Sequence, residues 1–230
     1  LTNHLVFWGI CLFAGLTAVP LLAILGEVLF RGWQQFSWEF FTEPTPTAYK
    51  AMKAVAAGET IPGGIANGII GTLLMLGMAT VVAVPIGILC GIYLAENREK
   101  RFAAIVSYLT DLLQGTPSVI IGIITYIWVV VPMKGYSAIA GSVALFIMML
   151  PLIIRSTEET MKILPASLKE AGLALGGNYA RVVLKVQLPA AFGGIFTGVL
   201  LAISRVIGET APLMFTALGC SLIRWDVDKP

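Results

Sequence analysis

Five long stretches of this chain are nearly free of charged side chains, and this feature most restricts how it can fold. They are residues 5–25, 65–95, 102–131, 136–154 and 190–218. A helix of about 20 mainly apolar residues crosses a hydrocarbon layer of roughly 30 Å. Hydrophobic types make up 57% of the 230 residues and charged types only 12%, whereas soluble domains carry about 25%. The sequence therefore predicts an all-α, polytopic transmembrane helical bundle with about five spans, embedded in a lipid bilayer.

Composition and missing motifs exclude several classes of function. The net charge of +2 is too small for a nucleic-acid binder. The three cysteines lie far apart and there is one histidine, so neither a metal site nor a disulfide framework is supported. The phosphate-binding loop of ATPases and the nucleophile motif of serine hydrolases do not occur. We expect no cofactor, metal or nucleic-acid partner, and neither ATP binding through such a loop nor serine-hydrolase chemistry.

Basic residues predict the orientation of the spans. The loops 96–101 and 155–189 lie on one side by parity and hold three and five Lys or Arg residues, while the opposite loops hold six over more sequence. Because cytoplasmic loops are richer in Lys and Arg, we expect these two loops and the amino terminus to be cytoplasmic. The first run is longer than the apolar part of a signal peptide, about 7–15 residues, so we expect a retained span.

The segment 31–62 is then outside and begins with five aromatic residues: Trp33, Phe36, Trp38, Phe40 and Phe41. These residues predict an interfacial aromatic belt, with a ligand pocket as the alternative.

The segment 155–189 is polar and interrupts the apolar pattern. Ser167 is a candidate N-cap with Glu170 at capping-box spacing, and the helix would stop near Gly176-Gly177. A second short helix is expected over 178–187, and Pro189 would open the fifth span. Two short amphipathic helices cannot cross a membrane, so they would dock a soluble partner or form an ordinary interfacial loop.

The same segment resembles a known motif, the EAA motif of ABC-importer permeases, which runs E-A-A-x3-G-x9-I-x-L-P. Gly172 stands for the third residue and Val186 for the isoleucine. The resemblance implies an ATPase-coupling loop, in which Glu170 caps or braces the loop and Gly176 permits its turn. The matching residues are Glu170, Ala171, Gly172, Gly176, Val186, Leu188 and Pro189.

A second segment narrows the resemblance. Residues 205–213, Arg-Val-Ile-Gly-Glu-Thr-Ala-Pro-Leu, resemble the R-x-I-G-E-T-A-P-L signature of the A-type membrane subunit of the phosphate ABC importer, and 109–113, 115–122 and 155–159 are also similar. The resemblance implies a permease for inorganic phosphate in a bacterial-type cytoplasmic membrane. Its implied partners are two ATPase subunits, a second related permease subunit and an external phosphate-binding protein. The alternatives are a sulfate or molybdate permease, an ion-coupled secondary transporter, or a membrane scaffold that does not transport.

The resemblance also implies a domain organisation and a sixth span. Residues 1–64 would form the first helix and outer loop, and 65–218 the permease core with its coupling loop 155–189. Permeases of this family have six spans and end inside. We therefore expect the sixth span to be missing and 219–230 to form a truncated outer segment.

Three charged residues inside the predicted spans are candidates for the substrate pathway. Arg205 would lie roughly 20 Å along the fifth span, with Glu209 on the same helix face. They predict a polar face along the pathway, with a self-neutralising internal pair as the alternative. Asp111 would line the inner mouth or cap a broken helix.

Two further features are given structural roles. Arg155 is expected to extend from the end of the fourth span to the membrane interface. The glycine pairs 87/91 and 194/198 predict close helix packing.

Overall fold

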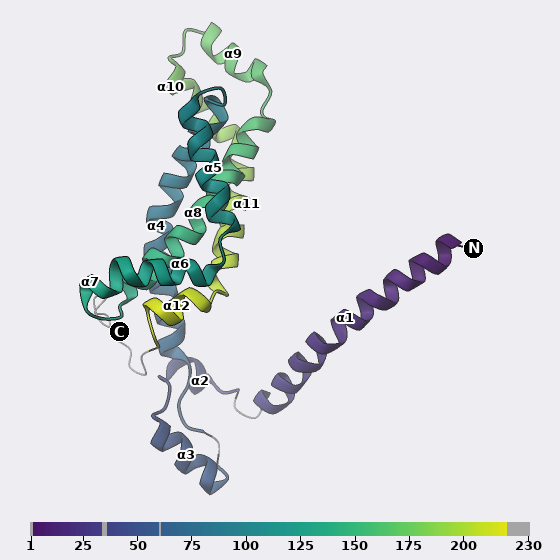
Figure 1. Cartoon of the computed structure of the whole chain (residues 1–230), viewed down its shortest axis with the longest axis vertical. Coiled ribbons are helices and arrows are strands. Elements are labelled where there is room, and N and C mark those ends of the chain that lie inside the picture. Colours follow the sequence, from purple (N-terminus) through teal and green to yellow (C-terminus); the bar gives the residue numbers. More distant parts are fainter. Residues whose placement is uncertain (1, 34–35, 60, 220–230) are drawn as a thin grey trace. The chain divides into compact units, whose positions relative to one another are not determined.

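The computed structural model describes residues 2–33, 36–59 and 61–219, and all regular structure in these ranges is helical (Figure 1). The expected all-α class is confirmed. The expected outer segment 219–230 lies, except for Gly219, outside the described residues. The elements are α1 (Thr2–Gly32), α2 (Trp38–Thr42), α3 (Ala48–Ala57), α4 (Ala66–Glu96), α5 (Arg101–Gly115), α6 (Ser118–Thr125), α7 (Val131–Met133), α8 (Ala138–Ile163), α9 (Ala166–Ala174), α10 (Tyr179–Val182), α11 (Leu188–Ile207), α12 (Ala211–Thr216) and the π-helical turns η2 (Tyr126–Val130) and η3 (Val183–Gln187).

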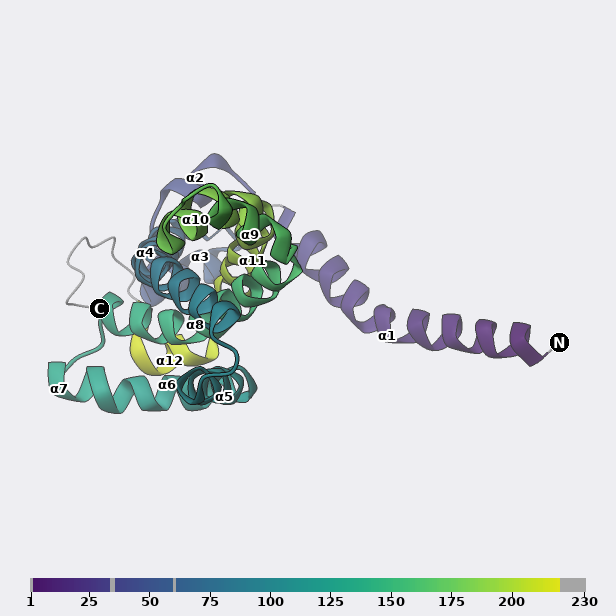
Figure 2. The same ribbon diagram turned by 90° about the horizontal axis from the view of Figure 1, so that it is seen from above.

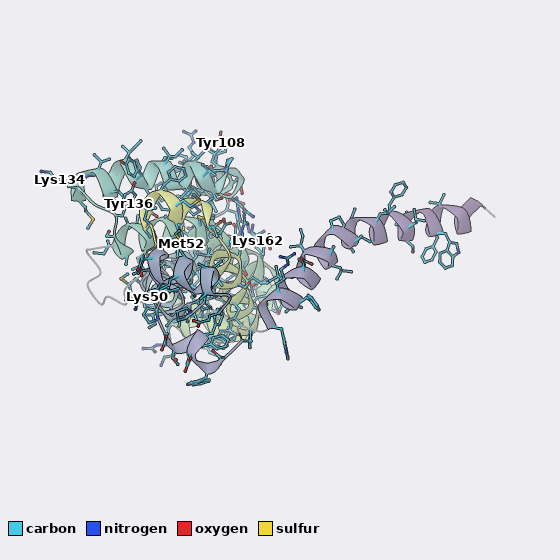
Figure 3. The ribbon with its side chains drawn as sticks, turned by 90° about the horizontal axis from the view of Figure 1, so that it is seen from below. Lys50, Met52, Tyr108, Lys134, Tyr136 and Lys162 are labelled. Carbon is cyan, nitrogen blue, oxygen red and sulfur yellow. The ribbon has the colours of Figure 1, made fainter. Side chains whose placement is uncertain are left out.

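The chain forms two compact units, Leu1–Asn67 and Gly68–Pro230. In the first unit, the Ser37 hydroxyl caps α2 by accepting the Phe40 amide hydrogen at 3.3 Å. The rings of Phe36, Phe40 and Phe41 pack at centroid distances of 5.4 to 6.2 Å. The following helix α3 carries Lys50 and Met52 (Figure 3). The interfacial position of this segment stays a prediction.

Four helices in the described part of the chain are long and apolar enough to cross a membrane. They are Val6–Gly32, Ala66–Glu96, Ala138–Ile163 and Tyr179–Ile207. The first three correspond to the predicted runs 5–25, 65–95 and 136–154. The helix that contains the fourth run continues to Ile163, so the polar residues 155–163 belong to α8.

The third run does not form one straight helix. α5 and the helical segment Ser118–Met133 meet at a bend of 105°, which makes them a broken span or a re-entrant loop. Pro117 disfavours a helical conformation for the residue before it, and Thr116 is extended, with φ −75° and ψ 130°. The predicted run 102–131 is therefore broken between Gly115 and Pro117, the two residues in it that disfavour a continuous helix.

The fifth run ends earlier than predicted. The short second helix expected over 178–187 is present as α10 and η3, which continue without a gap into α11, and Pro189 lies in the first turn of α11, as predicted. At the other end α11 stops at Ile207 with Gly208 as its cap residue, and Pro212 lies in the first turn of the next helix, a position where proline is tolerated. The chain then turns into α12, which lies between α8 and α6 (Figure 2).

Helix α8 is the most buried of the four long helices and packs between α4 and α11. A β-carbon on Gly91 of α4 would lie 2.7 Å from the carbonyl oxygen of Ile154, and one on Gly198 of α11 would lie 1.7 Å from the Ser156 hydroxyl oxygen. The other glycine of each pair makes the same kind of contact, Gly87 with Ile153 and Gly194 with Thr160. Both glycine pairs therefore serve close packing, as predicted. In lipid this packing matters because apolar burial alone does not drive helices together.

A larger side chain at Gly91 tests this packing. We expect Gly91→Leu to lower the free energy of unfolding in detergent micelles by about 1–3 kcal/mol, because overpacking forces α4 and α8 apart. Gly77→Leu, on the same helix at a position where a β-carbon meets nothing within 4 Å, should change it by less than about 0.5 kcal/mol. Equal losses in the two variants would contradict the packing role of Gly91.

Candidate functional site

A polar loop, residues 164–178, connects α8 to the helix that starts at Tyr179 and carries α9. α9 begins after Pro165, which occupies the cap position in an extended conformation with φ −66° and ψ 137°. Ser167 lies inside the first turn, so the prediction that it caps the helix is wrong. Among the described residues no side-chain hydrogen bond joins Ser167 to Glu170, and the Glu170 side chain is exposed.

The loop turns where the sequence predicts it. Gly176 has φ +80°, a left-handed conformation that other residues rarely adopt. Its amide donates to the carbonyl of Leu173 at 2.9 Å, and the Gly177 amide donates to that of Gly172 at 3.2 Å. These two bonds satisfy the last carbonyls of α9.

Gly172 explains why the third position of the motif must be small. A β-carbon there would lie 2.8 Å from Cγ1 of Val182, so α9 packs directly against α10 at this point. An alanine needs only a small shift of a methyl group, whereas a long side chain would separate the two helices.

The remaining motif residues fall into two groups. Glu170, Ala171 and the neighbouring Leu175, which is 91% exposed, lie on the outer surface of the loop. Val186, Leu188 and Pro189 lie instead in the continuous helix Tyr179–Ile207, where Leu188 packs against a buried apolar cluster. The predicted coupling loop 155–189 is therefore too long at both ends, because α8 and this helix extend into it.

Arg155 forms a network of polar contacts between α8 and α5. Its side chain is 20% exposed, and it donates to Asp111 at 3.0 Å, to Glu158 at 2.6 Å and to the Ser107 carbonyl at 2.9 Å. Lys162 also pairs with Glu158, which is 6% exposed. Helix α8 continues for two further turns beyond Arg155 and directs this side chain toward α5, whereas its position relative to the membrane interface stays a prediction.

Asp111 does not cap the broken helix from a buried position. Its side chain is 62% exposed, and it pairs with Arg155 across the α5–α8 contact. A cavity of about 450 Å³ lies beside this pair (Figure 3 labels Tyr108 and Lys162, two of its lining residues). The other lining residues are Leu94, Arg98, Ala103, Ala104, Ser107, Asp111 and Glu158.

Arg205 lies directly before the break between α11 and α12, and Glu209 lies within it. Arg205 is exposed in the last turn of α11, and Glu209 is partly buried after Gly208. The expected placement on one helix face is wrong, because the helix ends between them. The salt bridges of the described residues do not join Arg205 to Glu209, nor either of them to Asp111. This break is at the opposite end of α11 from the polar loop (Figure 1).

The Arg155 network makes a stability prediction. Arg155→Met should lower the free energy of unfolding by about 1–3 kcal/mol, because it leaves the buried Glu158 with one partner fewer. Asp111→Asn removes only the exposed partner and should cost less than about 1 kcal/mol. Unfolding of the purified variants in detergent measures both values. A larger loss for Asp111→Asn than for Arg155→Met would contradict the prediction that the buried contact with Glu158 contributes more to stability.

The fold defines a class of membrane protein. The chain superposes on a solved structure described as inward-facing conformations of the MetNI methionine ABC transporter, with a TM-score of 0.55 and 20% sequence identity over 76% of this chain and 77% of that chain. The chain therefore shares the fold of a membrane-embedded chain with several helical spans in that structure.

Sequence comparison identifies the family. Residues 83–224 match the family described as binding-protein-dependent transport system inner membrane component, and the chain belongs to this family. It is similar to a phosphate transport system permease protein PstA of Haemophilus influenzae, at 38% identity over 90% of this chain and 70% of that protein. The protein of the same name from Yersinia pestis is 39% identical over 91% of this chain and 68% of that protein. PstA 1 of Mycobacterium tuberculosis is 33% identical over 85% of this chain and 62% of that protein.

Proposed function

We propose that this chain is the membrane-spanning permease subunit of an ATP-driven importer that translocates inorganic phosphate across the cytoplasmic membrane. The observation that carries the proposal is the identity of 38–39%, over about nine tenths of the chain, with relatives named as phosphate transport permeases. The segment 205–213 and the polar loop supply the local features that this role needs. The polar loop and the amino terminus face the cytoplasm in this proposal.

The partners follow from the same proposal. Two ATPase subunits, a second related permease subunit and an external phosphate-binding protein complete the importer. ATP is hydrolysed in the partner subunits, and this chain is not itself an enzyme. The polar loop suits docking because Leu175 extends its apolar side chain into solvent from a short, rigidly turned segment, and amphipathic helices commonly dock in grooves of a partner.

The contact between α9 and α10 tests the docking role. Gly172→Leu should reduce the amount of ATPase subunit that co-purifies with the assembled permease about tenfold, which corresponds to a loss of about 1.4 kcal/mol of binding free energy. The physical cause is the displacement of α9 from Val182. Gly172→Ala, which restores the usual residue of the motif, should co-purify at the parent level. Equal co-purification by the Leu variant would contradict docking through this loop.

The substrate pathway is proposed to pass the break between α11 and α12. A charged arginine within the membrane must face protein or water, because exposure to hydrocarbon costs at least about 2.5–3.5 kcal/mol. The described salt bridges do not pair Arg205 with Glu209, which supports a pathway role over a self-neutralising pair. Arg205 would attract the oxyanion, and Glu209 would weaken its binding enough for release. Asp111, held by Arg155, would line the inner mouth.

Substitution of Arg205 tests this pathway. Arg205→Ala should reduce phosphate uptake by reconstituted vesicles at least about tenfold, since the attraction for the anion is lost. Arg205→Lys should retain part of the activity, because lysine keeps the positive charge but cannot form the bidentate hydrogen bonds of a guanidinium group. Lys185→Ala, an exposed cation near the polar loop, is the control and should behave as the parent. Uptake by Arg205→Ala at the parent rate would exclude the role.

Substrate and energy source can be tested in one reconstituted system. The complete importer in vesicles is given binding protein loaded with phosphate, sulfate or molybdate, and ATP hydrolysis is measured. Stimulation by the phosphate-loaded protein alone supports the proposal. Stimulation by another anion would indicate a different oxyanion permease. Uptake that survives without ATPase subunits and stops when the proton gradient is removed would indicate an ion-coupled transporter.

A further inference from the structure

One carboxylate at the end of α4 is bound from three other elements. Glu96 is the last residue of α4, and its side chain is 10% exposed. It forms an ion pair with Lys169 of α9, accepts a hydrogen bond of 2.7 Å from the hydroxyl of Tyr179, and accepts one of 3.3 Å from the amide of Gln187. The ammonium group of Lys169 also lies 4.9 Å from the centroid of the Tyr179 ring.

These contacts connect the polar loop to α4, a helix that is not its neighbour along the chain. The chain itself connects the loop only to α8 and to the helix that starts at Tyr179. Glu96 adds α4, which lies more than 70 residues earlier in the sequence. An apolar cluster of α4, α8 and α11 completes the base of the loop, with Met161, Ala191 and Ile195 buried and Ile88, Ile92, Ala95, Leu164 and Leu188 packed around them.

These bonds are strong, and together they also restrict the position of the Glu96 carboxylate. Hydrogen bonds to an ionised group are roughly twice as strong as those between neutral groups. Lys169 from the loop and Tyr179 and Gln187 from the helix that follows it all donate to this carboxylate, so the loop cannot move away from α4 without breaking the ion pair of Lys169 with Glu96. The close contacts of Gly87 and Gly91 hold α4 against α8. A displacement of the loop is therefore transmitted to α4, α8 and α11.

We propose that Glu96 is a positioning residue that joins the polar loop to α4, so that α4 moves together with α8 and α11 when the ATPase displaces α9. The inference rests on the proposed function, because it names the contact through which a conformational change of the ATPase subunits is transmitted to the membrane helices. Without Glu96 the ATPase still docks, but part of the displacement that it imposes on α9 bends the loop and is not transmitted to α4.

A distance measurement tests this within the assembled importer. Spin labels are placed at exposed positions, Ser167→Cys on α9 and Leu89→Cys on α4, after serine replaces the native cysteines. In the chain with Glu96, the distance distribution should be the same with and without bound ATP. In Glu96→Ala, it should broaden or shift when ATP binds. A distribution that changes with ATP in the chain with Glu96, or that stays constant in Glu96→Ala, overturns the inference.

Transport measurements in the same complexes separate positioning from a merely structural role. In Glu96→Ala the phosphate transported per ATP hydrolysed should fall at least about tenfold, while the ATPase subunits co-purify at the parent level. Glu99→Ala, an exposed carboxylate in the same turn, should leave the ratio unchanged. The double variant Glu96→Lys with Lys169→Glu restores the ion pair and should recover most of the ratio.

The outcomes are distinguishable from failure of the proposed function. Loss of the ATPase subunits together with transport in Glu96→Ala would show a structural role and overturn the inference, as would an unchanged ratio. If the parent complex does not transport phosphate, the proposed substrate is wrong. The distance measurement still decides in that case whether Glu96 joins the loop to α4.

Discussion

The close approach of α4 and α11 to the central helix α8 is the interaction on which the rest of the structure depends. Lipid is as apolar as the side chains that it surrounds, so helices in a membrane are held by packing and by interhelical hydrogen bonds. The glycine pairs bring both neighbours into contact with the backbone and short side chains of α8. This contact sets the position of Arg155, whose network joins α5 to the bundle, and supports the base of the polar loop.

Two helix breaks give the bundle its functional geometry. The first break lies between Gly115 and Pro117, where α5 ends and the chain turns into α6, and the second follows Ile207, where α11 ends before α12. The short helices that follow the two breaks pack together, and Gly122 leaves room for Pro212 at their contact. The candidate pathway residues Arg205 and Glu209 lie at the second break, while the polar loop lies at the other end of the same helix. α11 therefore links the proposed ATPase contact to the proposed pathway.

The sequence-based predictions succeeded where the signal was local. The apolar runs predicted the spans, Gly176 predicted the turn of the loop, and the spacing of the glycine pairs predicted close packing. They failed where a helix could extend beyond its apolar run: α8 continues through Arg155, and the helix of the last span begins at Tyr179. Hydrophobicity marks the part of a helix in lipid and contains no information about how far the helix continues into water. The break at Gly208 interrupts the fifth run, which was predicted as one span from 190 to 218 despite Gly208, Glu209 and Pro212.

The amino-acid sequence by itself determined the fold class, the number of apolar runs, the breaking residues and the motif of the polar loop, because each depends on backbone hydrogen bonds or residues within a few turns. Only the tertiary structure decided which charged groups meet. Arg155 pairs with Asp111 across 44 positions and Lys169 with Glu96 across 73. Such partners are chosen by which helix faces lie together, and a single sequence does not record that choice because many opposite charges could be paired at similar free energy.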